Sequence, residues 1–417
     1  MNRGPWVPLL AGDLALAARQ AVLDIAADFG SQDRIRNASL ADGHAGQALF
    51  YDYLARFTGE GKHAELAARS LDAAIDALSE GPPMHPGLYG GFTGVAWTAE
   101  HLAEGPEEDS EDAGAEIDEA VQAVLAQRPW GETYDLIRGL VGLGVYALER
   151  LPRPAARACL TEVVAHLLEL AEIGPVGATW FTPPDHLGPW ALSVCPQGRY
   201  DLGVAHGVPG VIALLADSYR LDLLDDAGVA LLETAVGWLL AQKRGTAGPC
   251  FASWIGPGIE PQAARLAWCY GDAGIAATLL YAARAAARPD WEAAALEIAA
   301  RAAARSIAES GVADAGLCHG ALGLAHLFNR IHQATRDDRF AAAARVWYEH
   351  GLRLRRPGQG IGGFQVWERR ADGSSAWSED PGFLVGAAGI GLALLAAIAD
   401  QEPLWDRVLL VATLPLC

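Results

Sequence analysis

Apolar segments recur along the chain, and each of them starts with the same kind of turn. Seven times, two glycines spaced as GxxG lead into a run of apolar, helix-forming residues, at intervals of 48 to 68 residues. Intervals of this size are typical of proteins built from repeated structural units. The first glycines of the seven turns are Gly43, Gly91, Gly139, Gly207, Gly271, Gly320 and Gly386.

The segments between these runs have a different pattern, in which apolar positions recur at helical spacing among Ala, Glu and Arg. Residues 63–78, 157–170, 230–243 and 291–308 are examples. An amphipathic helix covers a core with one face, whereas a helix that is apolar all round must be surrounded. We therefore expect an all-α fold, an α/α toroid of seven helix pairs whose inner helices follow the GxxG turns.

The repeats extend over the whole chain, so we expect one toroid domain over 1–417, with the segment near 11–28 as its first outer helix. An open solenoid is the alternative, but it would expose the apolar helices along one concave face. Residues 104–120 carry nine acids and no base, which predicts a solvated loop or a small insertion near 100–130. Residues 180–201 lack helical periodicity and predict a long loop beside the active site.

Composition and charge narrow the function. The chain is 51% hydrophobic and 20% charged, which is typical of a globular protein with a large core. A formal net charge of −20 argues against nucleic acid and anionic membranes as partners. Residues 381–399 carry no charge, but Pro381 and four glycines within the first eleven residues favour a buried helix over a transmembrane segment.

Six irregularly spaced cysteines do not form a disulfide framework, and the N-terminal residues show no signal peptide. We therefore expect a cytoplasmic protein without a transmembrane segment.

Cysteine and histidine stand at equivalent places in two of the turns. Cys269 lies two residues before Gly271, Cys318 lies two before Gly320, and His319 follows directly. Equivalent turns of neighbouring repeats start at the same end of the toroid, so these side chains are expected to converge. Two thiolates and an imidazole suit zinc, with a fourth position left for water or substrate. The spacing matches no short zinc motif, and a buried structural cysteine is the alternative for Cys269 alone.

Further polar residues lie near the same turns. His206 could be a fourth ligand, a general acid–base or a core histidine; since no cysteine stands beside it, acid–base work fits better. Asp135, four residues before a turn glycine, faces the same rim or caps a helix. Arg265 and Tyr270 flank the Cys269 turn and are further candidates for the site. The alternative for Arg265 is a charged residue on the surface. Asp272 is expected to be a local turn or cap residue.

Taken together, these motifs resemble the lanthionine synthetase C-like family, the lanthipeptide cyclases. LGVAHGVPG, RLAWCYGDAG and CHGALG occur in this order, and YDLIRGLVG and PGFLVGAAGIG are similar to weaker motifs of the family. With no lyase or kinase region before residue 1, the chain looks like a stand-alone bacterial cyclase. Asp201 stands where the resemblance predicts Asn more often.

The resemblance implies a zinc ion held by Cys269, Cys318 and His319. It implies that a substrate cysteine, bound to zinc as thiolate, adds to dehydroalanine or dehydrobutyrine of the same dehydrated precursor peptide. The product is a (methyl)lanthionine thioether ring, and the reaction is a step of antibiotic biosynthesis. A dehydratase and a transporter are further expected partners.

The resemblance also assigns the acid–base residues. His206 would protonate the α-carbon of the enolate, and Asp135 would fix the tautomer of the imidazole. Arg265 would stabilise the enolate oxygen, and Tyr270 is a further active-site residue.

Several other functions remain open at this point. The same site could add glutathione or another external thiol to dehydroamino acids in proteins. A prenyltransferase-like or terpene-processing toroid would need an acidic diphosphate cluster, and a glycosidase would need paired carboxylates. The non-enzymatic alternative is a peptide-binding scaffold with structural zinc.

Overall fold

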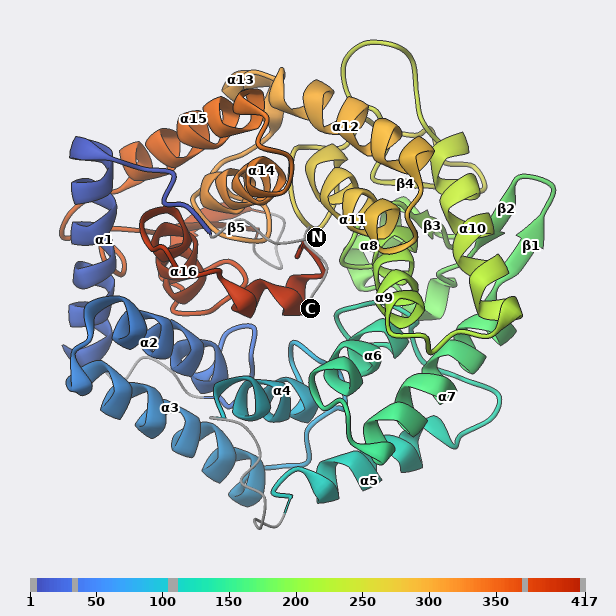
Figure 1. Ribbon diagram of the computed structural model, residues 1–417, viewed down its shortest axis with the longest axis horizontal. Helices are drawn as coiled ribbons and strands as arrows, with labels where there is room; N and C mark the ends of the chain where they lie inside the picture. Colours follow the sequence, from blue (N-terminus) through green and yellow to red (C-terminus); the bar gives the residue numbers. More distant parts are fainter. Residues whose placement is uncertain (1–5, 32–36, 104–111, 370–373, 413–417) are drawn as a thin grey trace. The chain divides into compact units, whose positions relative to one another are not determined.

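The computed structural model describes residues 6–31, 37–103, 112–369 and 374–412. The chain divides into two compact units. The first comprises Met1–Met84, Tyr89–Glu104 and Ser310–Trp405, and the second comprises His85–Leu88, Gly105–Glu309 and Asp406–Cys417. Each unit is built from paired helices (Figure 1). A single domain over 1–417 stays a prediction.

The first unit contains α1 and α16, the first and the last α-helix of the described residues. Its paired helices are α2 with α3, α14 with α15, and α1 with α16. The last of these pairs joins an N-terminal helix to a C-terminal one, and near it Trp6 Nε1 donates a hydrogen bond to the carbonyl of Ala396 (3.0 Å). The elements are α1 (Gly12–Ser31), α2 (His44–Thr58), α3 (Gly61–Glu80), α4 (Phe92–Leu102), α14 (Ala321–Thr335), α15 (Asp338–Leu354), β5 (Val366–Arg369), β6 (Ser375–Ser378) and α16 (Ala387–Ile398).

In the second unit α6 packs on α7, α9 on α10 and α11 on α12, while α5 packs on α7. Two short antiparallel ladders join β1 to β2 and β3 to β4, with Asp201 opposite Trp254. The elements are α5 (Ala115–Leu125), α6 (Leu140–Glu149), α7 (Pro154–Leu170), β1 (Glu172–Gly174), β2 (Gly177–Thr179), η1 (Pro184–His186), α8 (Pro189–Val194), β3 (Tyr200–Asp201), α9 (Val208–Arg220), α10 (Asp226–Ala241), β4 (Trp254–Ile255), α11 (Asp272–Ala285) and α12 (Pro289–Ala303). The short elements α13 (Ile307–Ser310) and η2 (Leu404–Leu409) lie where the chain passes between the units.

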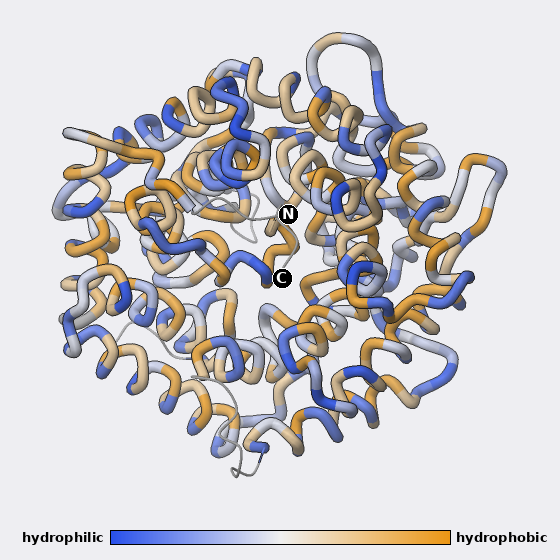
Figure 2. Tube along the Cα trace, in the orientation of Figure 1, coloured by the Kyte–Doolittle hydropathy of each residue, from blue (hydrophilic) through white to orange (hydrophobic). Residues whose placement is uncertain are grey.

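The two kinds of helix predicted from the sequence are both present. Nearly every residue of α11 and α16 is buried, as expected for helices that are apolar all round. On α3, by contrast, burial is confined to His63, Ala67, Ser70 and Ala74, which lie one turn apart on one face. Hydrophobic and hydrophilic residues accordingly alternate along this helix (Figure 2).

Each of the seven GxxG turns begins a helix, and its first glycine is the residue before the helix start. No side chain caps these helices; the preceding loop folds under the helix instead. Before α14, for example, the N–H groups of Ala321 and Leu322 donate to the carbonyls of Asp314 and Ala315 (2.9 and 3.3 Å). The loop backbone thus takes up donors that a helix start leaves unpaired.

This loop requires glycine because its backbone passes close to the helix start. A Cβ atom at Gly207 would collide with the carbonyl oxygen of Asp201, and one at Gly271 with that of Arg265. Gly271 also has φ of +122°, a conformation that other residues rarely adopt. The glycines therefore fix the path of the loop, and the residues just before them are held at the end of the helix.

Three segments without the repeat pattern fall into place. Residues 180–201 are only partly a loop, since they contain η1, α8 and β3. The acidic segment is helical from Ala115 onward, and residues 104–111 lie outside the described residues. The uncharged segment 381–399 contains α16, a buried helix, as predicted. Among the described helices, none has the length and apolar character needed to cross a membrane.

Candidate metal and acid–base site

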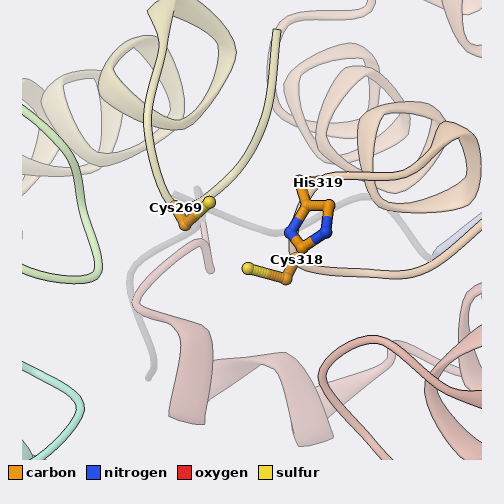
Figure 3. A group of neighbouring side chains, drawn as sticks. All are labelled: Cys269, Cys318 and His319. Carbon is orange, nitrogen blue, oxygen red and sulfur yellow. The ribbon is translucent and has the colours of Figure 1, made fainter. Parts of the chain in front are cut away.

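The three predicted metal ligands stand in the loops that lead into α11 and α14. One ligand atom from each of Cys269, Cys318 and His319 lies within 4.8 Å of the others (Figure 3). Cys269 is buried, and the other two side chains are half-buried. This is the one such His, Cys, Asp or Glu group found among the described residues, and His206 is not part of it.

The chemistry of this group fits a metal ion. Nδ1 of His319 is buried and has no hydrogen-bond partner among the described residues. A buried ring nitrogen without a hydrogen-bond partner has lost its hydration without compensation, unless it binds a ligand such as a metal ion. Cys269 and Cys318 are not joined by a disulfide. Sulfur and imidazole donors are the set that zinc prefers, and three of them leave one position of a tetrahedron open.

His206 and Asp135 form a hydrogen-bonded ion pair. Nδ1 of His206, in the loop before α9, lies 2.6 Å from Oδ2 of Asp135, in the loop before α6. The other oxygen of Asp135 accepts a hydrogen bond from the N–H of Arg138 (2.8 Å). The carboxylate therefore closes its own turn and orients the imidazole, whereas it does not cap α6, which begins after Gly139 without a side-chain cap. The loops are also joined by backbone, since Leu136 N donates to the carbonyl of Ala205 (3.1 Å).

The pair keeps both groups charged. Burial raises the pKa of the Asp135 carboxyl group, but His206 and backbone N–H groups lower it more, so its pKa lies below the ordinary value. Enclosure by the loops lowers the pKa of the His206 imidazole, yet Asp135 outweighs this and holds that pKa above its ordinary value. The His206 side chain remains 39% exposed, so its edge reaches solvent.

Tyr270 lies against His206. The two rings are stacked, with centroids 5.9 Å apart and planes inclined by 26°. The hydroxyl group of Tyr270 donates to Oδ1 of Asp201 (2.7 Å). Burial raises the pKa of Tyr270 well above its ordinary value, and the charge of Asp201 raises it further. The phenol is therefore neutral, and its proton is engaged by a carboxylate.

Comparison with known proteins places the chain in a family. Residues 34–410 match the family of lanthionine synthetase C-like proteins. The chain belongs to this family. A search of curated proteins finds no match. Among solved structures, "Nisin cyclase" is similar over 95% of this chain and 98% of its own, with 20% identity and a TM-score of 0.74. A sugar epimerase from a ruminal bacterium is similar over 92% and 97%, with 11% identity and a TM-score of 0.49.

The likeness to nisin cyclase shows the fold of this lanthionine synthetase C-like protein. The predicted all-α class, the α/α toroid, is thereby confirmed.

The structure places two further residues of the turns, Arg265 and Asp272, in different surroundings. Arg265 is exposed, and within the described part of the chain no hydrogen bond or ion pair connects its side chain to His206 or Tyr270. Asp272 is not a local cap: it is fully buried and accepts hydrogen bonds from the N–H groups of Cys250 and Phe251 (2.8 and 3.1 Å). The turn-residue interpretation of Asp272 is therefore wrong, because the carboxylate ties down a segment more than twenty residues away.

Sequence reasoning overlooked the residues that surround Tyr270. In the sequence Asp201 stands out only as a departure from Asn, and no motif contains Arg199 or Trp254. One signal was available for Asp201, because it lies six residues before Gly207, where the loop passes closest to the helix. Nothing in the local pattern pairs Trp254 with β3, since that ladder joins residues far apart in the chain.

Proposed function

We propose that this protein is a zinc-dependent lanthipeptide cyclase. It adds cysteine thiols of a dehydrated precursor peptide to dehydroalanine or dehydrobutyrine residues of the same peptide and so forms (methyl)lanthionine rings. One observation carries the proposal: two thiols and an imidazole from separate GxxG turns lie within 4.8 Å of one another. Membership of the lanthionine synthetase C-like family supports it.

Cys269, Cys318 and His319 would hold the zinc ion. When bound, zinc makes a substrate thiol available as thiolate at neutral pH, although a free cysteine has a pKa of about 8.5. The unpartnered Nδ1 of His319 supports this assignment. The protein's own thiols must stay reduced to serve as ligands, which is why we assign the enzyme to the cytoplasm.

His206 would supply the proton that completes the addition. When sulfur bonds to the β-carbon, the electron pair of the carbon–carbon double bond moves toward the carbonyl group, and the α-carbon then takes a proton. The net reaction adds S–H across the double bond without loss of atoms. Asp135 engages Nδ1 of His206, which leaves Nε2 directed away from the carboxylate as the donor. The raised pKa of His206 keeps that donor protonated near neutral pH.

Arg265 and Tyr270 would complete the site. The exposed guanidinium group of Arg265 is the proposed partner of the developing enolate oxygen of the bound peptide. Tyr270 would form the wall of the site that lies against the face of the His206 ring.

The test uses a dehydrated precursor peptide that contains both cysteines and dehydroamino acids. With the zinc-loaded protein, free thiols should disappear while the mass of the peptide stays constant. Cys269→Ala and Cys318→Ala should lose the zinc ion and all cyclisation. Cys159→Ala, which removes a buried thiol elsewhere, is the matched control and should keep both.

Two results would contradict the proposal. Purified protein without stoichiometric zinc would remove the ligand assignment. Addition of glutathione in preference to ring formation would identify an external thiol as the substrate. If a dehydratase and a transporter are partners of this enzyme, they should co-purify with it in the presence of the precursor.

A further inference from the structure

A buried polar cluster surrounds the hydroxyl end of Tyr270. The carboxylate of Asp201 is fully buried and accepts three hydrogen bonds. The donors are the Tyr270 hydroxyl (2.7 Å), Nε of Arg199 (3.0 Å) and the Thr182 hydroxyl (3.1 Å). Because a buried carboxylate is stable only when its oxygens are occupied, this cluster holds its members in one arrangement.

Arg199 and Trp254 hold the same phenol from other sides. Nη2 of Arg199 donates to the Tyr270 hydroxyl oxygen (3.2 Å), and its guanidinium group lies over the Trp254 ring, 4.5 Å from the centroid. The Trp254 ring meets the Tyr270 ring edge to face, with centroids 5.7 Å apart. Since Asp201 and Trp254 are opposite one another in the β3–β4 ladder, the backbone itself sets the spacing of these contacts.

The opposite end of this arrangement is the imidazole of His206. Asp135 fixes only one ring nitrogen of His206, and a single hydrogen bond still allows the ring plane to tilt about it. The stacked ring of Tyr270 supplies the second contact. A tilt matters because proton transfer requires a short and well-aligned approach.

We infer that Asp201 is a positioning residue: through the Tyr270 hydroxyl it fixes the tyrosine ring against His206 and so sets the plane of the imidazole. Asp201 touches neither the substrate nor the metal ligands in this assignment. The inference deepens the proposed function and rests on it only for the statement that His206 is a proton donor.

The first test reads the ring placement without substrate or metal. In metal-free protein with ¹³C-labelled histidine, the His206 ring signals, identified by their loss in His206→Asn, carry the ring-current shift of Tyr270. Tyr270→Leu should abolish that shift, and Asp201→Asn and Tyr270→Phe should reduce it. Thr182→Val is the matched control, because it removes another donor to Asp201 but no contact to Tyr270, and it should leave the shift unchanged.

An unchanged His206 shift in folded Asp201→Asn and in Tyr270→Phe would overturn the inference. Tyr270→Phe keeps the Asp201–Arg199 pair intact, so it decides the matter even if Asp201→Asn leaves Arg199 without its counter-charge and fails to fold.

The second test separates positioning from binding. Asp201→Asn should lower kcat about tenfold while KM changes less than about twofold, because a misplaced donor affects the transition state rather than substrate binding. In a Tyr270→Leu background the same substitution should have no further effect on kcat. An equal loss in both backgrounds would overturn the inference. If the wild type forms no rings, the proposed function fails, while the histidine spectra still decide whether Asp201 positions the ring.

Discussion

Two histidines of this protein occupy the same place in the repeat and have opposite surroundings. His206 and His319 each lie directly before the first glycine of a GxxG turn. Nδ1 of His206 is bound to Asp135, and the ring is stacked on Tyr270. Nδ1 of His319 is buried without a hydrogen-bond partner among the described residues, and two thiols lie close to this side chain.

The difference separates what the repeat supplies from what the neighbours supply. The turn delivers a side chain to the helix start whatever its type, because both turn glycines pack against the loop backbone in the same way. The N–H of Gly207 donates to the carbonyl of Gly203, and that of Gly320 to the carbonyl of Gly316. A carboxylate neighbour then makes the imidazole a charged acid, since it raises the pKa. Thiol neighbours and an unpartnered nitrogen suit the imidazole to bind a metal ion, as proposed above. The turn therefore sets where the side chain lies, and the neighbouring residues set what it can do chemically.

The strongest way to break this comparison is to remove each histidine in turn. We expect His319→Asn to lose the metal ion and with it all ring formation. His206→Asn should keep stoichiometric metal, while kcat falls by about 10²- to 10⁴-fold, the usual contribution of a general acid. Metal analysis together with single-turnover cyclisation measures both effects. Loss of metal in His206→Asn would mean that the two histidines do not have separate roles.

The helix starts and the convergence of Cys269, Cys318 and His319 could be predicted from the sequence, for a physical reason. Both depend on the GxxG turn, in which close backbone contact demands glycine, so the requirement is written at fixed positions. Gly271, Cys269 and His319 could be interpreted in this way. The surroundings of Tyr270 could not, because Asp201, Arg199 and Trp254 meet through a ladder between distant segments. The role of Asp272 could not be predicted for the same reason, because its partners, Cys250 and Phe251, lie more than twenty residues before it rather than in its own turn.

A second change should sharpen the role of the carboxylate. Asp135→Asn removes the charge that holds the pKa of His206 above its ordinary value. A proton donor acts only while it is protonated, so activity is lost as the pH rises through that pKa. The alkaline limb of the kcat profile should therefore move to lower pH, and kcat should fall about tenfold or more. An unshifted limb would show that another group donates the proton. Metal content should not change.

A third change tests whether the turn, rather than its neighbours, sets the position of a ligand. Gly271→Ala places a Cβ atom against the carbonyl of Arg265 at φ of +122°, next to the loop that carries Cys269. Strain of this kind costs about 1–3 kcal/mol of stability, and we expect weaker metal binding as well. Gly90→Ala is the matched control, because a Cβ atom there meets nothing within 4 Å. Equal melting temperatures and metal affinities for both variants would contradict the role assigned to the glycine.

The smallest expected effect concerns the stability of the folded protein in the absence of metal. His206 has a raised pKa, so its contribution is complete below the ordinary value of 6.5 and is lost as pH rises through the raised value. Asp135 has a lowered pKa, so its contribution is complete above 3.8 and is lost as pH falls through the lowered value. The pair should therefore stabilise the fold most between these two limits.

The size of this contribution is limited by solvent. Because the His206 side chain is 39% exposed, screening should reduce the pair's contribution to less than about 1 kcal/mol. Chelator-treated wild type and Asp135→Asn, melted across a pH series, should differ most between pH 3.8 and 6.5 and converge in more alkaline buffer. His319 has no equivalent test, because within the described residues its buried Nδ1 has no hydrogen-bond partner. A difference that grows toward alkaline pH would mean that Asp135 supports the fold through its backbone contact with Arg138 rather than through the imidazole.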